Sequence, residues 1–140
     1  MKIIGIIGQK GGCGKSHLAI SLGVLADKNK GFAAILDVDP QGTVKKWSER
    51  RESSTPIVLE TTSTGLDEAI DAAREDNIDY LFIDTPPHVG KAIELVVKKS
   101  DLVLVPVRPD PSNIDALDGT WNIVSKSNAA LAVLNGVPTD

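Results

Sequence analysis

The sequence predicts an α/β fold, in which a doubly wound, mainly parallel sheet carries helices on both faces. Short apolar runs rich in β-branched residues recur along the chain, and most of them are almost continuously apolar. Strands that are buried on both faces produce such runs, whereas half-exposed strands alternate. The stretches between the runs have helical spacing, as in repeated strand-helix-strand units. Crossovers between parallel strands are right-handed almost without exception, so a three-layer sandwich is expected, formed by a single domain over residues 1–140.

The apolar runs predict five strands, and a sixth segment is expected at an edge of the sheet. In chain order the five are Lys2 to Ile7, Ala33 to Val38, Tyr80 to Ile83, Leu102 to Val105, and Leu131 to Leu134. The edge segment is Ile57 to Glu60.

Four stretches are predicted to be helices, namely Lys15 to Lys28, Leu66 to Arg74, Lys91 to Lys99, and Ala116 to Ser125. The first places leucines at helical spacing, and Gly31 is expected to end it. The second carries its apolar residues on one face and follows Thr64, a candidate N-cap. The charged, Ser-rich stretch from Lys45 to Pro56 is expected to be the end of a helix followed by a loop.

Composition excludes several classes of protein. The hydrophobic fraction of 41% and the charged fraction of 24% are ordinary globular values, which argues against disorder. No apolar run approaches the roughly 18 residues of a spanning helix, and the N-terminus enters a strand directly, so a cytoplasmic protein without a membrane contact is expected. The single cysteine agrees with a reducing compartment. A net charge of −4 argues against a uniformly basic nucleic-acid binder.

The first predicted strand runs into the segment GQKGGCGKS, residues 8–16, and a helix follows at once. Glycines allow the backbone to bring successive N–H groups close to phosphate oxygens, and the start of a helix adds its positive dipole end. Lys15 would contact the β- and γ-phosphates of ATP, and the Ser16 hydroxyl would bind Mg²⁺. The alternative is a Gly-rich turn with an exposed lysine. The nucleotide-binding residues are expected to be Gly11, Gly12, Cys13, Gly14, Lys15, Ser16 and His17.

Acidic residues follow two other predicted strands. Asp37 and Asp39 end the second, in DVDPQG, and Asp84 follows the strand that ends at Ile83. Carboxyl ends of parallel strands share one edge of the sheet, so the carboxylates and the glycine-rich loop should form one site. Magnesium bound with a triphosphate needs such carboxylates, and Asp84 is the Walker B candidate. The alternatives remain open: any strand can end in aspartate, and the other two could be turn-forming residues before Pro40.

The segment KGGCGKS resembles the deviant P-loop, K-G-G-x-G-K-[ST], of the ParA and MinD branch of P-loop ATPases. The strict P-loop pattern fails here, because Gln9 stands where its first glycine would be. The resemblance implies that Lys10 reaches across an ATP-bound dimer to the phosphates of the other subunit, as an arginine finger does elsewhere. It also implies that Asp39 orients the attacking water and that Asp37 supports the metal shell. A solvated loop lysine is the alternative for Lys10.

Two later segments extend this resemblance over essentially the whole chain. VPVRP, residues 105–109, is similar to a strand-end region of the family, and VLNGV, residues 133–137, is similar to the strand whose terminal asparagine meets adenine. Asn135 is therefore expected to contact the base through its amide. The chain departs from the family at His17, which replaces the usual threonine and is interpreted as a first-turn helix residue. Family members usually continue with another strand and helices, which the resemblance implies that residues 1–140 lack.

Together these features predict a ParA-like ATPase that binds ATP or ADP with Mg²⁺ and hydrolyses ATP slowly. The resemblance implies a homodimer formed on ATP binding, a ParB-like centromere-binding protein or cargo adaptor as partner, and contact with non-specific DNA. Lys10, Lys15 and Asp39 would be catalytic; Ser16, Asp37 and Asp84 would serve the metal. The alternatives are a relative that positions a protein complex, a nucleotide-binding module without hydrolysis, and an architectural DNA-binding protein.

Overall fold

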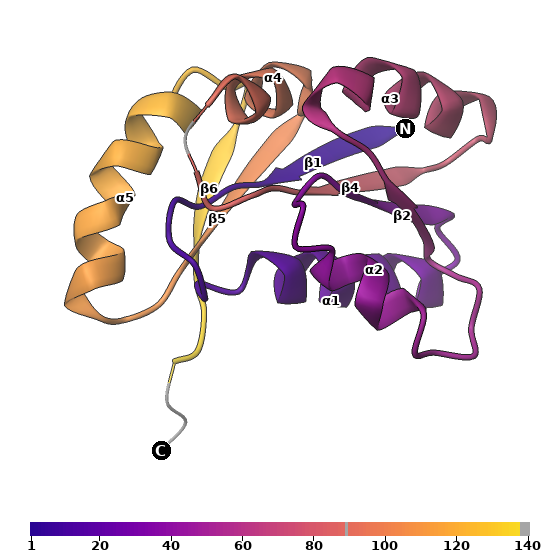
Figure 1. Cartoon of the computed structure of the whole chain (residues 1–140), viewed down its shortest axis with the longest axis horizontal. Helices are drawn as coiled ribbons and strands as arrows, with labels where there is room; N and C mark the ends of the chain where they lie inside the picture. Colours follow the sequence, from indigo (N-terminus) through magenta and orange to yellow (C-terminus); the bar gives the residue numbers. More distant parts are fainter. Residues whose placement is uncertain (89, 138–140) are drawn as a thin grey trace.

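The computed structural model describes residues 1–88 and 90–137 of the chain. Within these residues, parallel strands form one six-stranded sheet in the order β3-β2-β4-β1-β5-β6 (Figure 1). This confirms the predicted fold class, and it places the segment expected at an edge, β3, at an edge. The strands are β1 (Lys2–Ile6), β2 (Ala33–Asp37), β3 (Ile57–Glu60), β4 (Tyr80–Asp84), β5 (Leu102–Val107) and β6 (Ala130–Leu134).

Strand β1 lies inside the sheet, between β4 and β5. From β1 the chain moves to one side to form β2 and β3, returns to insert β4 next to β1, and then crosses to the other side to form β5 and β6. The direction of the winding therefore reverses at β1. Ligands of open α/β sheets bind beyond the carboxyl ends of strands at such a reversal. The loop that leaves β1 begins at this point.

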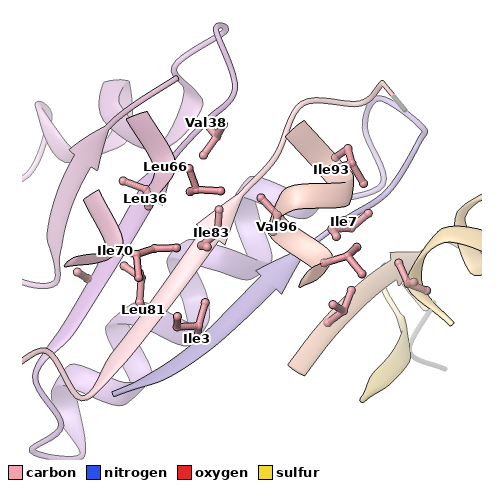
Figure 2. Close-up of a cluster of buried hydrophobic side chains, with 14 of the residues drawn as sticks. Ile3, Ile7, Leu36, Val38, Leu66, Ile70, Leu81, Ile83, Ile93 and Val96 are labelled. Carbon is pink, nitrogen blue, oxygen red and sulfur yellow. The ribbon is translucent and has the colours of Figure 1, made fainter. Parts of the chain in front are cut away.

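Helices cover both faces of the sheet (Figure 1). One face carries α1 (Lys15–Lys28) and α2 (Thr43–Ser48), and the other carries α3 (Leu66–Glu75), α4 (Lys91–Lys99) and α5 (Pro111–Val124). Each face has its own cluster of buried apolar side chains. On the α3 and α4 face, Ile70 and Val96 pack over the sheet near Ile83, with no more than 1% of each exposed (Figure 2). Full burial of such a side chain contributes about 1.5–3 kcal/mol to the stability of the fold. The burial of both faces of the sheet explains why most strand sequences are almost continuously apolar.

The last helix begins earlier than the sequence analysis expected. Helix α5 starts at Pro111 instead of Ala116, because the Asp110 carboxylate accepts a hydrogen bond from the backbone N–H of Asn113 at 3.0 Å. A proline at the first helical position after an aspartate N-cap is a favourable start, since the missing N–H has no partner there in any case. Local capping chemistry thus extends the helix beyond its apolar stretch.

Two predicted helix ends also need correction. Thr64 does not cap α3: it lies in a short 3₁₀ turn (Ser63–Gly65), its hydroxyl contacts that of Thr62 at 2.9 Å, and Gly65 precedes the helix without a side-chain cap. Helix α1 ends near Gly31 as expected, but the left-handed residue is Lys30, with a φ of 64°. Gly31 is needed for space, because a Cβ there would lie 2.9 Å from the Tyr80 ring.

Candidate nucleotide site

The site residues gather at the carboxyl edge of the three adjacent strands β2, β4 and β1. Asp84 is the last residue of β4, and it is in register with Asp37 of β2 on one side and with Ile6 of β1 on the other. The glycine-rich loop leaves β1 directly after Ile6 and leads into α1. Parallel pairing thus brings together the loop and the carboxylates that the sequence analysis assigned to one site.

The loop backbone depends on glycine at two positions. Gly12 has a φ of 78° and Gly14 has a φ of 99°, which lie in the left-handed region that side chains disfavour. Apart from their own chain neighbours, no heavy atom of residues 1–88 and 90–137 lies within 4 Å of where a Cβ would stand on Gly11 or Gly12, so the loop presents bare backbone to open space. An approaching anion would therefore meet main-chain N–H groups instead of side chains.

Helix α1 begins at the end of this loop without any anionic partner of its own. Its N-cap, Gly14, supplies no side-chain hydrogen bond, and its first turn contains no acidic residue. The first N–H groups of a helix have no intrahelical acceptor and carry the positive end of the helix dipole. In α1 these are the N–H groups of Lys15, Ser16 and His17, which is an arrangement that favours phosphate. The His17 side chain is exposed, so His17 would contribute to the site through its backbone N–H.

Asp84 is the most unusual residue of the site. Its side chain is completely buried, and neither carboxylate oxygen has a hydrogen-bond partner within residues 1–88 and 90–137. Burial raises the pKa of Asp84 to about 7, with nearby Asp37 raising it further, while the Ser16 hydroxyl and the Lys15 ammonium lower it. A buried carboxylate without a partner is costly, which indicates that a cation belongs beside it.

These features fit a magnesium ion bound together with a nucleotide. A hydroxyl from Ser16 and a carboxylate from Asp84 are oxygen ligands of the kind Mg²⁺ prefers, and Mg²⁺ usually takes its remaining ligands from water and phosphates. The described residues contain no group of three or more His, Cys, Asp or Glu side chains able to hold a metal ion by themselves. The residues present therefore fit Mg²⁺ arriving with a polyphosphate, and they do not form a separate metal cage.

Asp37 holds the next loop in place. One of its oxygens accepts hydrogen bonds from the backbone N–H groups of Val44 at 3.0 Å and Lys45 at 3.1 Å, and the other accepts from Asp39 N–H at 3.2 Å. Burial raises the pKa of Asp37, and these backbone hydrogen bonds partly offset the effect. Asp37 thus fixes the start of α2 and the position of Asp39. Its expected role in the metal shell stays a prediction.

Asp39 lies in a tight turn that opens onto a cleft. Its carboxylate accepts the N–H of Gln41 at 2.9 Å, so it is indeed a turn-forming residue, as the alternative interpretation proposed. It also lines a cleft of about 750 Å³ together with residues from three other segments, including Thr61, Pro87 and His88. The two interpretations are compatible, because one carboxylate oxygen can hold the turn while the other faces the cleft.

The two lysines of the loop take different positions. Lys15 is buried, and its ammonium donates a hydrogen bond to the carbonyl of Lys10 at 3.3 Å, within the loop. Lys10 extends towards α5, where its ammonium donates a hydrogen bond to the Ser112 hydroxyl at 2.6 Å. That hydroxyl in turn donates to Asp110 at 2.8 Å. Lys15 is thus in place for a bound anion, whereas Lys10 lies on the surface beside the loop.

Asn135 lies closer to the glycine-rich loop than the sequence analysis foresaw. It follows β6 directly, and its side-chain amide donates a hydrogen bond to the carbonyl of Cys13 at 2.9 Å. The Cys13 side chain itself is buried against Gly8. The expected contact with a base stays a prediction, but the structure adds a contact with the loop that the family resemblance did not imply.

The sequence analysis missed one residue that shapes the site. Thr85 follows Asp84, is buried, and donates its hydroxyl to the carbonyl of Ile6 at 2.8 Å. This bond joins the end of β4 to the end of β1, where the ladder stops and the phosphate loop begins. The signal was present in the string Asp-Thr-Pro-Pro, since a buried threonine before two prolines must find an acceptor for its hydroxyl.

The fold and the loop define a P-loop nucleotide-binding protein. The chain belongs to the family described as the CobQ/CobB/MinD/ParA nucleotide binding domain, which it matches over residues 4–137. This confirms the resemblance found in the sequence. Within the described residues, no helix is both long enough and apolar enough to cross a membrane.

Several known proteins are similar to this chain. It is 29% identical to the Maintenance of carboxysome distribution protein A of Gloeobacter kilaueensis, over 83% of this chain and 53% of the relative. It is 28% identical to Protein ParA of Rhizobium radiobacter, over 86% of this chain and 52% of the relative. The chain thus spans about half the length of these curated relatives.

Solved structures share the fold. Cobyrinic acid a,c-diamide synthase from Mycobacterium smegmatis, with bound ADP and magnesium, aligns with a TM-score of 0.79 at 16% identity, over 96% of this chain and 74% of that one. A plasmid partition protein from Borrelia burgdorferi aligns with a TM-score of 0.75 at 22% identity, over 99% of this chain and 80% of that one. At these identities the likeness concerns the fold alone.

Proposed function

We propose that this chain binds Mg–ATP at the loop of residues 10–16 and hydrolyses it slowly, with ATP-dependent dimerisation acting as a switch in plasmid or chromosome partition. The observation that carries the proposal is the buried carboxylate of Asp84, near Ser16 and Lys15, which accepts no hydrogen bond from residues 1–88 and 90–137. A cation held with a polyphosphate would supply the missing charge partner, and the bare loop and the start of α1 would supply N–H donors. The similarity to a relative named Protein ParA supports the biological role.

The chain's own residues would act mainly by positioning and charge. The loop N–H groups and Lys15 would hold the phosphates in line with the attacking water, and Asp39 would orient that water from its turn. Ser16 and Asp84 would hold Mg²⁺, which neutralises charge on the phosphates when it is bound. Lys10 would leave its contact with Ser112 and add a positive charge to the site of a second subunit. No covalent intermediate is required.

The partners belong to the same proposal. A homodimer would form on ATP binding in the cytoplasm, and a ParB-like centromere-binding protein or a cargo adaptor would stimulate it, with non-specific DNA as a further contact. Partition is not the only role consistent with the site. The similarity to a carboxysome distribution protein favours, as a second candidate, a protein that positions a large protein assembly.

A titration of the wild type with Mg–ATP tests the binding step, with Lys15→Ala as the variant. Removal of this charged donor should lower the affinity for ATP about ten- to a hundredfold, because a hydrogen bond to a charged group contributes about 1.5–3 kcal/mol. Lys28→Ala is the matched control, since Lys28 is an exposed lysine at the other end of the same helix. Equal ATP affinity of the two variants would exclude the assignment of Lys15.

Phosphate release and molecular size, measured with ATP and with ADP, test the switch. The proposal expects dimers with ATP, monomers with ADP, and slow turnover. Lys10→Ala should still bind ATP but release phosphate more slowly, because its charge is supplied to the other subunit. Binding without turnover or dimerisation would favour a nucleotide-binding module without hydrolysis. DNA binding that is indifferent to ATP would favour the architectural alternative.

A further inference from the structure

The end of β6 contacts the glycine-rich loop through one side chain. The amide nitrogen of Asn135 donates to the carbonyl of Cys13 at 2.9 Å, across 122 residues of sequence. The backbone of Asn135 is itself held, since its N–H donates to the carbonyl of Val107 at 2.8 Å and extends the ladder with β5. Asn135 therefore approaches the loop from a backbone position that is hydrogen-bonded to β5.

The loop is shaped to admit this amide. A Cβ added to Gly14 would lie only 2.0 Å from the Asn135 amide nitrogen, which no real side chain could tolerate. Gly14 also has a φ of 99°, so the position is closed to other residues for two independent reasons. The absence of a side chain at Gly14 therefore serves the contact with Asn135 as well as the turn of the loop.

The hydrogen bond settles the orientation of one peptide group. The peptide between Cys13 and Gly14 is trans, and in a trans peptide the C=O and the following N–H point in opposite directions. With the Cys13 carbonyl held by Asn135, the N–H of Gly14 must point away from β6. Rotation of this peptide changes ψ of Cys13 and φ of Gly14, and glycine gives little resistance to such a change, so an external hydrogen bond is what would keep the peptide in place.

We propose that Asn135 is a positioning residue of the phosphate loop, whose amide holds the Cys13–Gly14 peptide so that the Gly14 N–H remains directed to a phosphate oxygen. This inference rests on the proposed function, because it assumes that the loop binds a polyphosphate. It differs from a contact between Asn135 and the base in a way that can be measured. A residue that orients the loop affects every polyphosphate, whereas a base contact affects only ligands that carry a base.

The test compares Mg–ATP with Mg–tripolyphosphate, which has no base, on four proteins: the wild type, Asn135→Asp, Asn135→Ala and Asn128→Ala. Asn135→Asp has nearly the same shape but cannot donate to the Cys13 carbonyl when ionised. Asn128→Ala is the matched control, since Asn128 donates its amide to the Ser100 carbonyl at 3.5 Å, just before β6 and at its opposite end. Thermal unfolding of each protein shows whether it is folded.

Asn135→Ala should lower the affinity for both ligands by the same factor, about three- to tenfold, as expected for one hydrogen bond. Asn135→Asp also adds a negative charge beside the loop, so it should lower the affinity for both ligands at least as much. The Asn128→Ala protein should bind both ligands as the wild type does. A loss confined to ATP would assign Asn135 to the base and overturn the inference, and so would unchanged affinity for both ligands. If the wild type binds neither ligand, the proposed function fails, and the inference that rests on it fails as well.

A second measurement needs no ligand and does not depend on either variant binding. The ¹H–¹⁵N signal of the Gly14 amide reports the orientation and mobility of this peptide in the free protein. We expect the signal to shift or broaden in Asn135→Asp and Asn135→Ala and to stay unchanged in Asn128→Ala. An unchanged Gly14 signal in a folded Asn135 variant would show that the amide does not hold the peptide, and it would overturn the inference even if nucleotide binding were lost.

Discussion

Asp37 and Asp84 stand side by side in register at the carboxyl ends of β2 and β4, and burial raises the pKa of both. Their environments differ in one important way. Asp37 accepts three backbone hydrogen bonds, from the N–H groups of Asp39, Val44 and Lys45, whereas Asp84 accepts none from the described residues. One carboxylate is therefore used to build the site, and the other is left with unsatisfied charge that a bound cation would stabilise.

Asp84→Asn should raise the stability of the nucleotide-free protein. The pKa of Asp84 is about 7 in the folded protein against an ordinary 3.8, so the folded state binds this proton more tightly than the unfolded state does. The cost of ionising Asp84 therefore grows as the pH rises from about 4 to about 7 and is constant above that range, reaching about 4 kcal/mol at most. Urea unfolding should show a larger gain for the variant at pH 8 than at pH 5.

The same substitution should weaken Mg²⁺-dependent ATP binding, because an amide is a poorer magnesium ligand than a carboxylate. Asp71→Asn is a suitable control, since Asp71 is exposed on α3 and pairs with Arg74 in the next turn. Its stability should change little at either pH. A loss of stability in Asp84→Asn at pH 8 would contradict the view that this carboxylate is costly in the free protein.

Gly14→Ala and Gly11→Ala should have different effects, although both glycines belong to one loop. Alanine at position 14 would be strained by the positive φ and would collide with Asn135, so we expect it to lower stability by about 1–3 kcal/mol or more. The Cβ of an alanine at position 11 would have no described atom within 4 Å beyond its chain neighbours, so the melting temperature should be nearly unchanged. Both substitutions should lower the affinity for ATP. Gly11→Ala should do so because its methyl group would occupy space next to the phosphates. Equal melting temperatures for the two variants would contradict the structure of the loop.

Asp110→Ala should lower the melting temperature at neutral pH, because it removes the N-cap of α5. Hydrogen bonds from Asn113 and Ser112 hold the pKa of Asp110 at about 2, below the ordinary value of 3.8. A depressed pKa stabilises the fold above 3.8, and this contribution is lost as the pH falls towards 2. The difference between wild type and variant should therefore shrink between pH 5 and pH 2. Asp110→Asn can still cap the helix, so its melting temperature should lose only this pH dependence. A difference between the wild type and Asp110→Ala that is constant with pH would contradict the assignment.

Thr85→Val should destabilise the protein with almost no change in side-chain shape. The substitution removes the hydroxyl that donates to the Ile6 carbonyl and leaves that acceptor without this partner, at a cost of about 1–3 kcal/mol. Thr43→Val in α2 is a surface control, since Thr43 is exposed. Chemical unfolding would measure both effects. An unchanged midpoint for Thr85→Val would show that the bond between the ends of β4 and β1 does not hold the site together.

Much of the fold could be predicted because its signals are local. Runs such as Ala33 to Leu36 are continuously apolar, which predicts strands buried on both faces, and all six predicted strands are present. The helix that starts at Pro111 was placed five residues too late, because the prediction followed apolar periodicity and overlooked the capping aspartate. The Thr64 cap was wrong for a related reason: the threonine hydroxyl found a neighbouring partner in a 3₁₀ turn.

The sequence by itself determined the chemistry of the loop, the order of the strands and helices along the chain, and the three aspartates at strand ends, because glycine, lysine and carboxylate patterns express their chemistry locally. Only the tertiary structure decided what each group touches. Sheet pairing left Asp84 without a hydrogen-bond partner among the described residues and tied Asp37 to α2. The docking of β6 brought Asn135 onto the loop from more than a hundred residues away. Hydrogen bonds and burial depend on which distant segments become neighbours, and that information exists only once the sheet has formed.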